Sequence, residues 1–135
     1  MAVMKDETMS IRSSQDIVRV RQVVRTWAVE LRLSLVDQTK IVTAAGELAR
    51  NTVDHGGGGT VQLQIVNDER RRGLRLMFED HGPGIPDVEL AVKDGYTTGS
   101  GLGLGLGGAK RLSNEFEIFS RVGEGTRVSI TRWKA

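Results

Sequence analysis

The stretch Leu74-Arg75-Leu76-Met77-Phe78-Glu79-Asp80-His81-Gly82-Pro83-Gly84-Ile85 carries an alternating strand directly into a tight turn. Its alternation of side chains places the carboxylate of Asp80 on the core-facing side of the strand. A carboxylate buried without a partner is costly, so Asp80 needs a hydrogen-bond donor. The exocyclic amine of adenine would serve, and Gly82 and Gly84 would let the purine lie against bare backbone. A plain turn in which Asp80 caps nearby amides also explains the glycines, but not the inward carboxylate.

The segments before this stretch predict a hairpin partner and a first helix. A second alternating strand over 61–65 is joined to the first by the polar turn 68–73, which makes an antiparallel hairpin. Further upstream, apolar residues recur at spacings of three and four over 17–31 and predict an amphipathic helix. Ser13 or Ser14 is the expected cap of that helix.

A second helix and the remaining elements complete the predicted fold. Ser34 is the expected cap of this helix, with Asp37 three residues on as in a capping box, and the glycines 56–59 end it. The chain also contains a short strand near 9–12, a short helix near Pro86, a helix over 104–114, and a closing hairpin of strands 116–122 and 126–133. These elements predict an α/β two-layer sandwich, in which a mostly antiparallel mixed sheet carries helices on one face.

The second helix carries a polar pair, Glu47 and Asn51, in the run Glu47-Leu48-Ala49-Arg50-Asn51. Residues four apart project from one helix face, and here that face borders the core. Mg²⁺ takes oxygen ligands and keeps most of its waters, so the Asn51 amide oxygen with substrate phosphates can hold it. Glu47 would then lie one turn away, placed to orient or deprotonate an attacking hydroxyl. The spacing alone equally fits an ordinary hydrogen-bonded pair.

A glycine-rich run, Gly99-Ser100-Gly101-Leu102-Gly103-Leu104-Gly105-Leu106-Gly107-Gly108, leads into the helix over 104–114. The backbone amides of such a loop can cradle phosphate oxygens. The run contains a G-x-G-x-x-G match, but a polar loop precedes it rather than the buried strand of a dinucleotide site. A purely structural glycine loop is the alternative, although it would lose much entropy without a ligand to order it.

Size and composition predict one domain over residues 1–135 and exclude several classes of protein. The formal net charge of +2 is too even for a nucleic-acid surface. The densest basic run, 70–72, is expected to be a solvated turn rather than a binding patch. The chain has no cysteine, and it has no apolar stretch near the roughly 20 residues that span a bilayer. A cytoplasmic protein without nucleic-acid or membrane partners is therefore expected.

Taken in order, the three polar and glycine-rich segments resemble the N, G1 and G2 boxes of the GHKL (Bergerat) ATP-binding fold. Glu47-x-x-x-Asn51 is similar to the N box, Asp80-x-Gly82-x-Gly84 to the G1 box, and Gly101-Leu102-Gly103-Leu104-Gly105 to the G2 box. The resemblance covers nearly all of the chain. Within this fold the chain is similar to the small bacterial serine kinases of partner-switching systems, because these carry Glu where histidine kinases commonly carry Asn in the N box.

Several segments resemble the stressosome switch kinases more than the related anti-sigma-factor kinases. They are Val36-Asp37-Gln38, the N-box run 47–51, the turn 79–87 and the ending Arg132-Trp133. The resemblance implies that Glu47 is the general base, that Asn51 is the Mg²⁺ ligand and that the loop from Thr97 to Gly105 forms the phosphate cradle. The ATP-binding residues it implies are Asn51, Asp80, Gly82, Gly84, Ile85, Thr98, Gly99, Ser100, Gly101, Leu102, Gly103, Leu104 and Gly105.

The resemblance also implies a function and its partners. It implies a protein-serine/threonine kinase that uses ATP and Mg²⁺ to phosphorylate a STAS-domain protein, either a stressosome scaffold or an anti-sigma-factor antagonist. Once released, the kinase would activate a phosphatase in a stress-signalling pathway. Two alternatives stay open: an anti-sigma factor that sequesters a sigma factor and phosphorylates its antagonist, and a nucleotide-dependent scaffold without transfer activity. The scaffold is disfavoured because Glu47 and Asn51 are both present.

Overall fold

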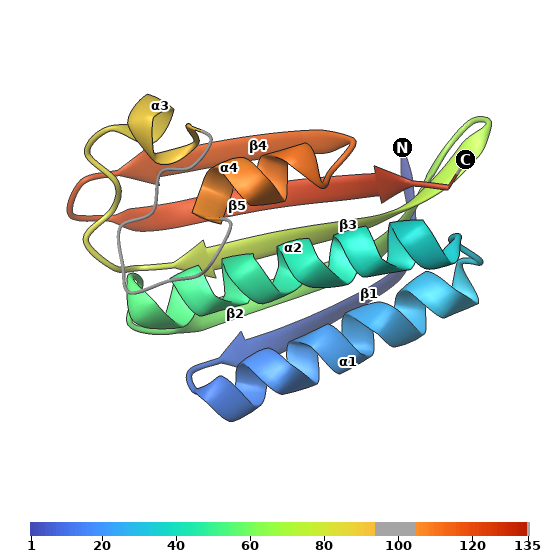
Figure 1. The fold of residues 1–135 in the computed structure, drawn as a ribbon, viewed down its shortest axis with the longest axis horizontal. Coiled ribbons are helices and arrows are strands. Elements are labelled where there is room, and N and C mark those ends of the chain that lie inside the picture. The colour runs from blue at the N-terminus through green and yellow to red at the C-terminus, as the bar shows by residue number, and fades with distance from the viewer. Residues whose placement is uncertain (94–104, 135) are drawn as a thin grey trace.

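The computed structural model describes residues 1–93 and 105–134, and its helices lie on one face of a five-stranded sheet (Figure 1). The strand order is β1-β2-β3-β5-β4. Helices on one face of a single sheet confirm the predicted two-layer sandwich. The four pairings between neighbouring strands are all antiparallel, so the described sheet has no parallel pair that would make it mixed. The elements are β1 (Ala2–Ile11), α1 (Ser14–Glu30), α2 (Leu35–Asp54), β2 (Gly59–Asp68), β3 (Arg71–Asp80), α3 (Val88–Ala91), α4 (Gly105–Arg111), β4 (Glu115–Arg121) and β5 (Gly125–Trp133).

Serine side chains begin both long helices. The hydroxyl of Ser13 accepts from the backbone N–H of Asp16 at 3.3 Å, and that of Ser34 accepts from Asp37 at 3.1 Å. Each bond satisfies one of the amides that have no partner within the first helical turn. The prediction of Ser34 as a cap is therefore confirmed, and of the two candidates for α1 the cap is Ser13.

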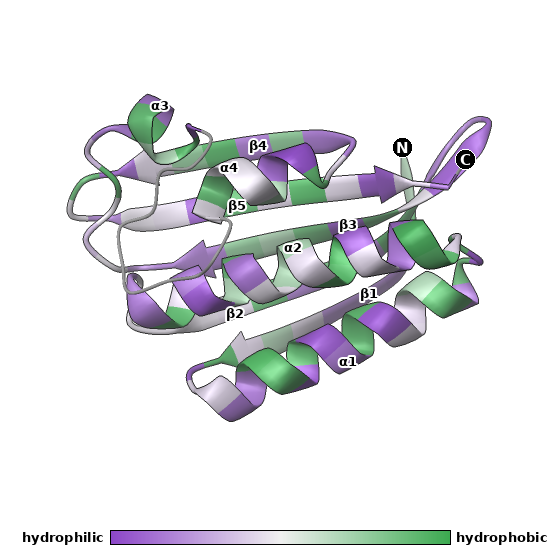
Figure 2. Ribbon diagram, in the orientation of Figure 1, coloured by the Kyte–Doolittle hydropathy of each residue, from purple (hydrophilic) through white to green (hydrophobic). Residues whose placement is uncertain are grey.

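The core lies between the helices and one face of the sheet, and hydrophobic residues recur along the helices and strands that enclose it (Figure 2). The alternating residues predicted for β2 and β3 point into it, as do the apolar stripes of α1 and α2. The fully buried large side chains are Ile11, Val20, Val24, Ile41, Leu48, Val61, Leu63, Val66, Leu74, Leu76 and Ile130. Among the described residues, no helix is long and apolar enough to cross a membrane.

Four elements differ in length from their predictions. β2 extends to Asp68 and β3 begins at Arg71, so the hairpin turn is residues 69–70 rather than 68–73, and two of the three arginines expected in a solvated turn belong to β3. β1 pairs with β2 from Ala2 to Ile11 rather than over 9–12, because most of this edge strand is exposed and its polar residues give no apolar alternation. The helix predicted over 104–114 is α4, which ends at Arg111. Asn114 has already left the helix and donates its backbone N–H to Thr131 of β5 at 2.9 Å.

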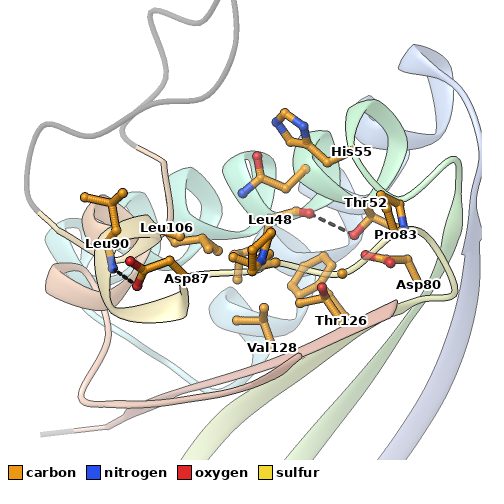
Figure 3. A pocket seen from close by; sticks show the side chains of 16 residues that line it. Leu48, Thr52, His55, Asp80, Pro83, Asp87, Leu90, Leu106, Thr126 and Val128 are labelled. Atoms are coloured by element: carbon orange, nitrogen blue, oxygen red, sulfur yellow. Dashed lines mark hydrogen bonds between the residues drawn. The ribbon is translucent and has the colours of Figure 1, made fainter. Parts of the chain in front are cut away.

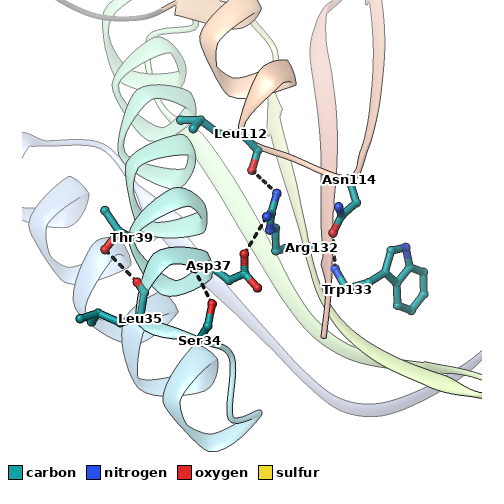
Figure 4. Close-up of polar contacts among 8 residues, drawn as sticks. All are labelled: Ser34, Leu35, Asp37, Thr39, Leu112, Asn114, Arg132 and Trp133. Atoms are coloured by element: carbon teal, nitrogen blue, oxygen red, sulfur yellow. Dashed lines mark hydrogen bonds and ion pairs between the residues drawn. The ribbon is translucent and has the colours of Figure 1, made fainter. Parts of the chain in front are cut away.

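An ion pair ties the beginning of α2 to β5 (Figure 4). Arg132 donates to Asp37 at 2.6 Å and to the backbone carbonyl of Leu112 at 3.2 Å, and the two charged side chains are only 13% and 16% exposed. The hydrogen bond from Arg132 holds the pKa of the Asp37 carboxyl below its ordinary value, against the opposing effect of burial. The pair therefore joins the helical layer to the sheet through groups that are mostly removed from water.

Replacing Arg132 by methionine should destabilise the fold by about 3 kcal/mol, because it leaves a mostly buried carboxylate without its partner. The matched control is Arg127→Met on the same strand. Arg127 also pairs with a carboxylate, Glu79, at 2.9 Å, but its side chain is 63% exposed, so its loss should cost about 0–1 kcal/mol. Urea unfolding of both variants measures the difference. Equal costs for the two arginines would contradict the structural importance of the Asp37 pair.

The same pair predicts how the stability difference between the unmodified chain and Arg132→Met depends on pH. Because the folded-state pKa of Asp37 is lowered, its contribution is complete above the unfolded value of about 3.9 and is lost as pH falls through the folded pKa. Burial without the arginine raises the pKa of Asp37 in Arg132→Met, so unfolding free energies measured from neutral pH downward should show a difference that is constant at first and shrinks in the acidic range, once that carboxyl takes up a proton in the variant. A difference that shrinks near neutral pH would assign the effect to another group.

Candidate functional site

A cavity of about 460 Å³ opens between α2, the end of β3, the beginning of β5, the segment 83–91 and the beginning of α4. Its walls are mainly apolar, and a few polar side chains reach into it (Figure 3). Cavities of a few hundred Å³ with this mixture are typical of small-molecule sites. The apolar lining includes Leu48, Phe78, Ile85, Leu90, Leu106 and Val128, and the polar lining includes Asn51, Thr52, His55, Asp80, Asp87 and Thr126.

Asp80 ends β3 with its carboxylate directed into this cavity (Figure 3). Its position follows the alternation of the buried residues before it, as predicted. One oxygen, Oδ1, accepts from the backbone N–H of Gly82 at 2.9 Å. Among the described residues, no donor is bonded to Oδ2. The carboxylate thus caps its own turn, as the plain-turn alternative requires, and keeps a second oxygen for a donor that enters the cavity.

The two glycines of the turn are explained by the packing of the protein itself. Gly84 has a φ of 78°, and a Cβ there would lie 2.7 Å from the carbonyl carbon of Arg121. A Cβ on Gly82 would lie 2.7 Å from the Cα of Gly56. The two missing side chains therefore face other backbone segments rather than a purine. Packing alone accounts for glycine at both positions, the contact of their backbone with a purine stays a prediction, and Gly84 and Ile85 line the cavity.

The polar pair on α2 borders the same cavity. Asn51 lines it, and Glu47 lies one turn earlier on that face of the helix. The Glu47 carboxylate accepts from the backbone N–H of Gly105 at 3.4 Å, which is longer than an ordinary N–H···O bond. This contact brings the helix segment of Glu47 to Gly105, which is the first residue of α4 and the last of the motif 101–105.

The other predicted residues of the glycine-rich loop lie outside the described residues. These are Thr98, Gly99, Ser100, Gly101, Leu102, Gly103 and Leu104. The structure therefore brings Asp80 and Asn51 to one cavity and places Glu47 beside it, while only Gly105 represents the third segment. No group of three or more His, Cys, Asp or Glu side chains able to hold a metal occurs in the described part of the chain. A cation here would have to share the Asn51 oxygen with ligand phosphates, which suits Mg²⁺.

Sequence reasoning missed Thr126 and Thr52. Thr126 lies directly across from Asp80 in the β3–β5 register and lines the cavity. Only the pairing of the strands places it there, so no local motif could have identified it. Thr52 follows Asn51 on α2; it is 3% exposed and donates its hydroxyl to the carbonyl of Leu48 at 2.9 Å. Its spacing of four residues from Leu48, which was predicted to be buried, was a usable signal that places it on the inner face of the helix.

A comparison with protein families decides which class of protein carries this cavity. Residues 36–135 match the family model of histidine kinase-, DNA gyrase B- and HSP90-like ATPases. The chain belongs to this family. The match begins at the second residue of α2 and includes the N-box helix, the Asp80 turn and the glycine-rich run.

Curated relatives within the ATPase family are protein kinases and anti-sigma factors. The chain is 45% identical over 123 residues to the serine/threonine-protein kinase RsbT of Bacillus subtilis, covering 91% of this chain and 92% of the relative. It is 29% identical over 126 residues to the anti-sigma F factor of Anoxybacillus flavithermus, covering 88% and 85%. The expected serine/threonine-protein kinase of this ATPase family is therefore confirmed, with anti-sigma factors among its relatives.

Solved structures show the same fold. A Mycobacterium tuberculosis structure of RsbU and RsbW domains superposes with a TM-score of 0.68 at 21% identity, covering 98% of this chain and 34% of that chain. The mycobacterial sensor histidine kinase MprB superposes with a TM-score of 0.56 at 18% identity, covering 96% and 97%. At such identities the likeness concerns the fold of this ATPase family and not the chemistry of individual members.

Proposed function

We propose that this kinase binds Mg-ATP in the cavity and transfers the γ-phosphoryl group to a serine or threonine of a STAS-domain protein. The observation that carries the proposal is the meeting of Asp80 and Asn51 at one cavity, with Glu47 a single helical turn away. Three roles that phosphoryl transfer needs (base recognition, metal coordination and orientation of the hydroxyl) then fall to three neighbouring residues.

In the proposed complex the adenine occupies the apolar part of the cavity. Phe78 and Leu106 supply part of that wall, and Asp80 Oδ2 accepts from the exocyclic amine. A guanine base would present a carbonyl oxygen at that point, which an ionised carboxylate repels. The cavity should therefore select adenine over guanine, because the wrong base leaves a buried charge without a donor. Gly82, Gly84 and Ile85 maintain the turn that aims this carboxylate.

Asn51 and Glu47 act on the phosphate end of the nucleotide in this proposal. Bound Mg²⁺ would neutralise part of the phosphate charge, with the Asn51 amide oxygen as its ligand from the protein. Glu47 exchanges its long contact with Gly105 for the hydroxyl of the substrate, orients it toward the γ-phosphorus and accepts its proton. The loop that includes residues 98–104 is proposed to cradle the phosphates.

The partners follow from the kinase resemblance and from the relatives. RsbT is named a serine/threonine-protein kinase and further relatives are named anti-sigma F factors, which supports partner switching by phosphorylation. We propose a STAS-domain substrate whose phosphorylation releases the kinase to activate a phosphatase. Location in the cytoplasm and a single domain over 1–135 stay predictions from the sequence.

An assay of label transfer tests this function. The purified chain is incubated with γ-³²P-labelled ATP, Mg²⁺ and candidate STAS proteins from the same genome, each with its serine and threonine residues intact or replaced by alanine. We expect label on one STAS protein, dependent on Mg²⁺ and lost with the replaced hydroxyls. Binding of ATP without transfer to any STAS protein would contradict the proposed substrate class.

The alternative of an anti-sigma factor has support from the relatives at 28–29% identity. Affinity purification from the native cell separates the two functions. A sigma factor retained in stoichiometric amount would favour sequestration, whereas retention of a STAS protein and a phosphatase is expected for the switch kinase.

A further inference from the structure

Gly56 packs directly against the side chain of Asp80. A Cβ added at Gly56 would lie 2.5 Å from the Cβ of Asp80 and 2.6 Å from its Oδ2, whereas non-bonded carbons pack at about 3.5–4.0 Å. The backbone of Gly56 is not among the described positive-φ glycines. Its conformation therefore suits other residues, and glycine is required here for space alone.

The other side of the Asp80 carboxylate is held by Gly82. The N–H of Gly82 donates to Oδ1 at 2.9 Å, and its own missing side chain faces the Cα of Gly56. The carboxylate is thus confined between the segment that follows α2 and its own turn. Gly56 itself is not among the residues that line the cavity.

We propose that Gly56 is a positioning residue for adenine recognition, which acts by fixing the direction of the Asp80 carboxylate. The inference depends on the proposed function, because it presupposes that Asp80 accepts from the adenine amine. A methyl group at position 56 would displace the whole Asp80 side chain, because turning the carboxylate alone does not relieve the contact with its Cβ. Hydrogen bonds weaken steeply with misalignment, so the bond to the amine should be lost, whereas the apolar contacts to the purine ring depend much less on direction.

Gly57 provides a matched control in the same loop. A Cβ there would meet nothing within 4 Å, although its φ of 75° makes alanine strained. Gly57→Ala therefore imposes the backbone cost of a lost glycine without any contact to Asp80. It should lower the melting temperature and leave the affinity for ATP unchanged.

The test compares the binding of two nucleotides to the full chain. The unmodified protein, Gly56→Ala and Gly57→Ala are each titrated with both nucleotides by calorimetry. The first nucleotide is ATP and the second is purine riboside triphosphate, which lacks the exocyclic amine. We expect Gly56→Ala to weaken ATP binding at least about tenfold, the lower end for a charged hydrogen bond. Binding of the purine analogue should change by less than about twofold, as for independent sites.

Each outcome decides between the inference and the proposed function. If Gly56→Ala loses affinity equally for ATP and for the purine analogue, up to complete loss through misfolding, then Gly56 serves the fold. That result would overturn the inference. Unchanged ATP binding in Gly56→Ala would overturn it as well. If the unmodified chain binds no ATP, or binds the analogue as tightly as ATP, the proposed adenine role of Asp80 itself fails.

Discussion

Replacing Glu47 by glutamine should reduce phosphoryl transfer by about 10²- to 10⁴-fold, the usual contribution of a general base. Glutamine keeps the shape and can still accept from the N–H of Gly105, but it cannot take the proton of the attacking hydroxyl. Nucleotide binding should stay nearly unchanged, because Glu47 is not among the residues that line the cavity. Single-turnover transfer to the STAS substrate, together with calorimetry of ATP binding, measures the two effects separately.

The control for this variant is Asp54→Asn on the same helix. Asp54 is exposed at the last residue of α2, and it lies outside the cavity lining. Removing its charge should leave transfer unchanged, because it lies two turns beyond Glu47. Normal transfer by Glu47→Gln would show that the base is wrongly assigned, whatever the state of ATP binding.

Asp80→Asn should weaken ATP binding by about 10- to 100-fold, as expected for the loss of a hydrogen bond to a charged acceptor. Asparagine fits the same space beside Gly56 and can still accept from Gly82 through its oxygen, so the turn should persist. Its amide nitrogen then takes the place of Oδ2 and presents a donor to the donor of adenine. Calorimetric titration with ATP measures the loss, and an unchanged dissociation constant would refute the adenine role.

The neighbouring carboxylate provides a control for Asp80→Asn. Glu79 is part of the same strand but pairs with Arg127 across the sheet at 2.9 Å, and it is absent from the cavity lining. Glu79→Gln removes one charge from the same segment without touching the cavity. A comparable fall in ATP affinity in both variants would indicate a general electrostatic effect instead of recognition by Asp80.

Local patterns predicted the parts of the fold that depend on local chemistry. The alternation before Asp80 predicted both the strand and the inward carboxylate, and the serine and spacing patterns predicted the caps and faces of the two long helices. The family resemblance tied Asp80 and Asn51 to one nucleotide before the structure placed them at the same cavity.

The remaining features depend on contacts between distant segments. Thr126 reaches the cavity only because β5 pairs with β3 in a register that sets it opposite Asp80. The glycine at position 56 ends a helix pattern, and its contact with Asp80 appears only when the chain has folded. The length of β1 was missed because an exposed edge strand needs no apolar alternation. Contacts between distant segments are not encoded in local patterns, and these features could therefore not be predicted from the sequence.

The most direct test of the central claim is to map where the nucleotide binds. Amide chemical shifts of the isotope-labelled chain are followed by NMR during titration with Mg²⁺ and a non-hydrolysable ATP analogue. A saturable response centred on Asn51, Asp80, Gly84 and Gly105 is predicted. A response confined to another groove, which Phe119 and Arg127 line together with Asp80, with the signals of Asn51, Gly84 and Gly105 unchanged, would place the nucleotide elsewhere and contradict this site.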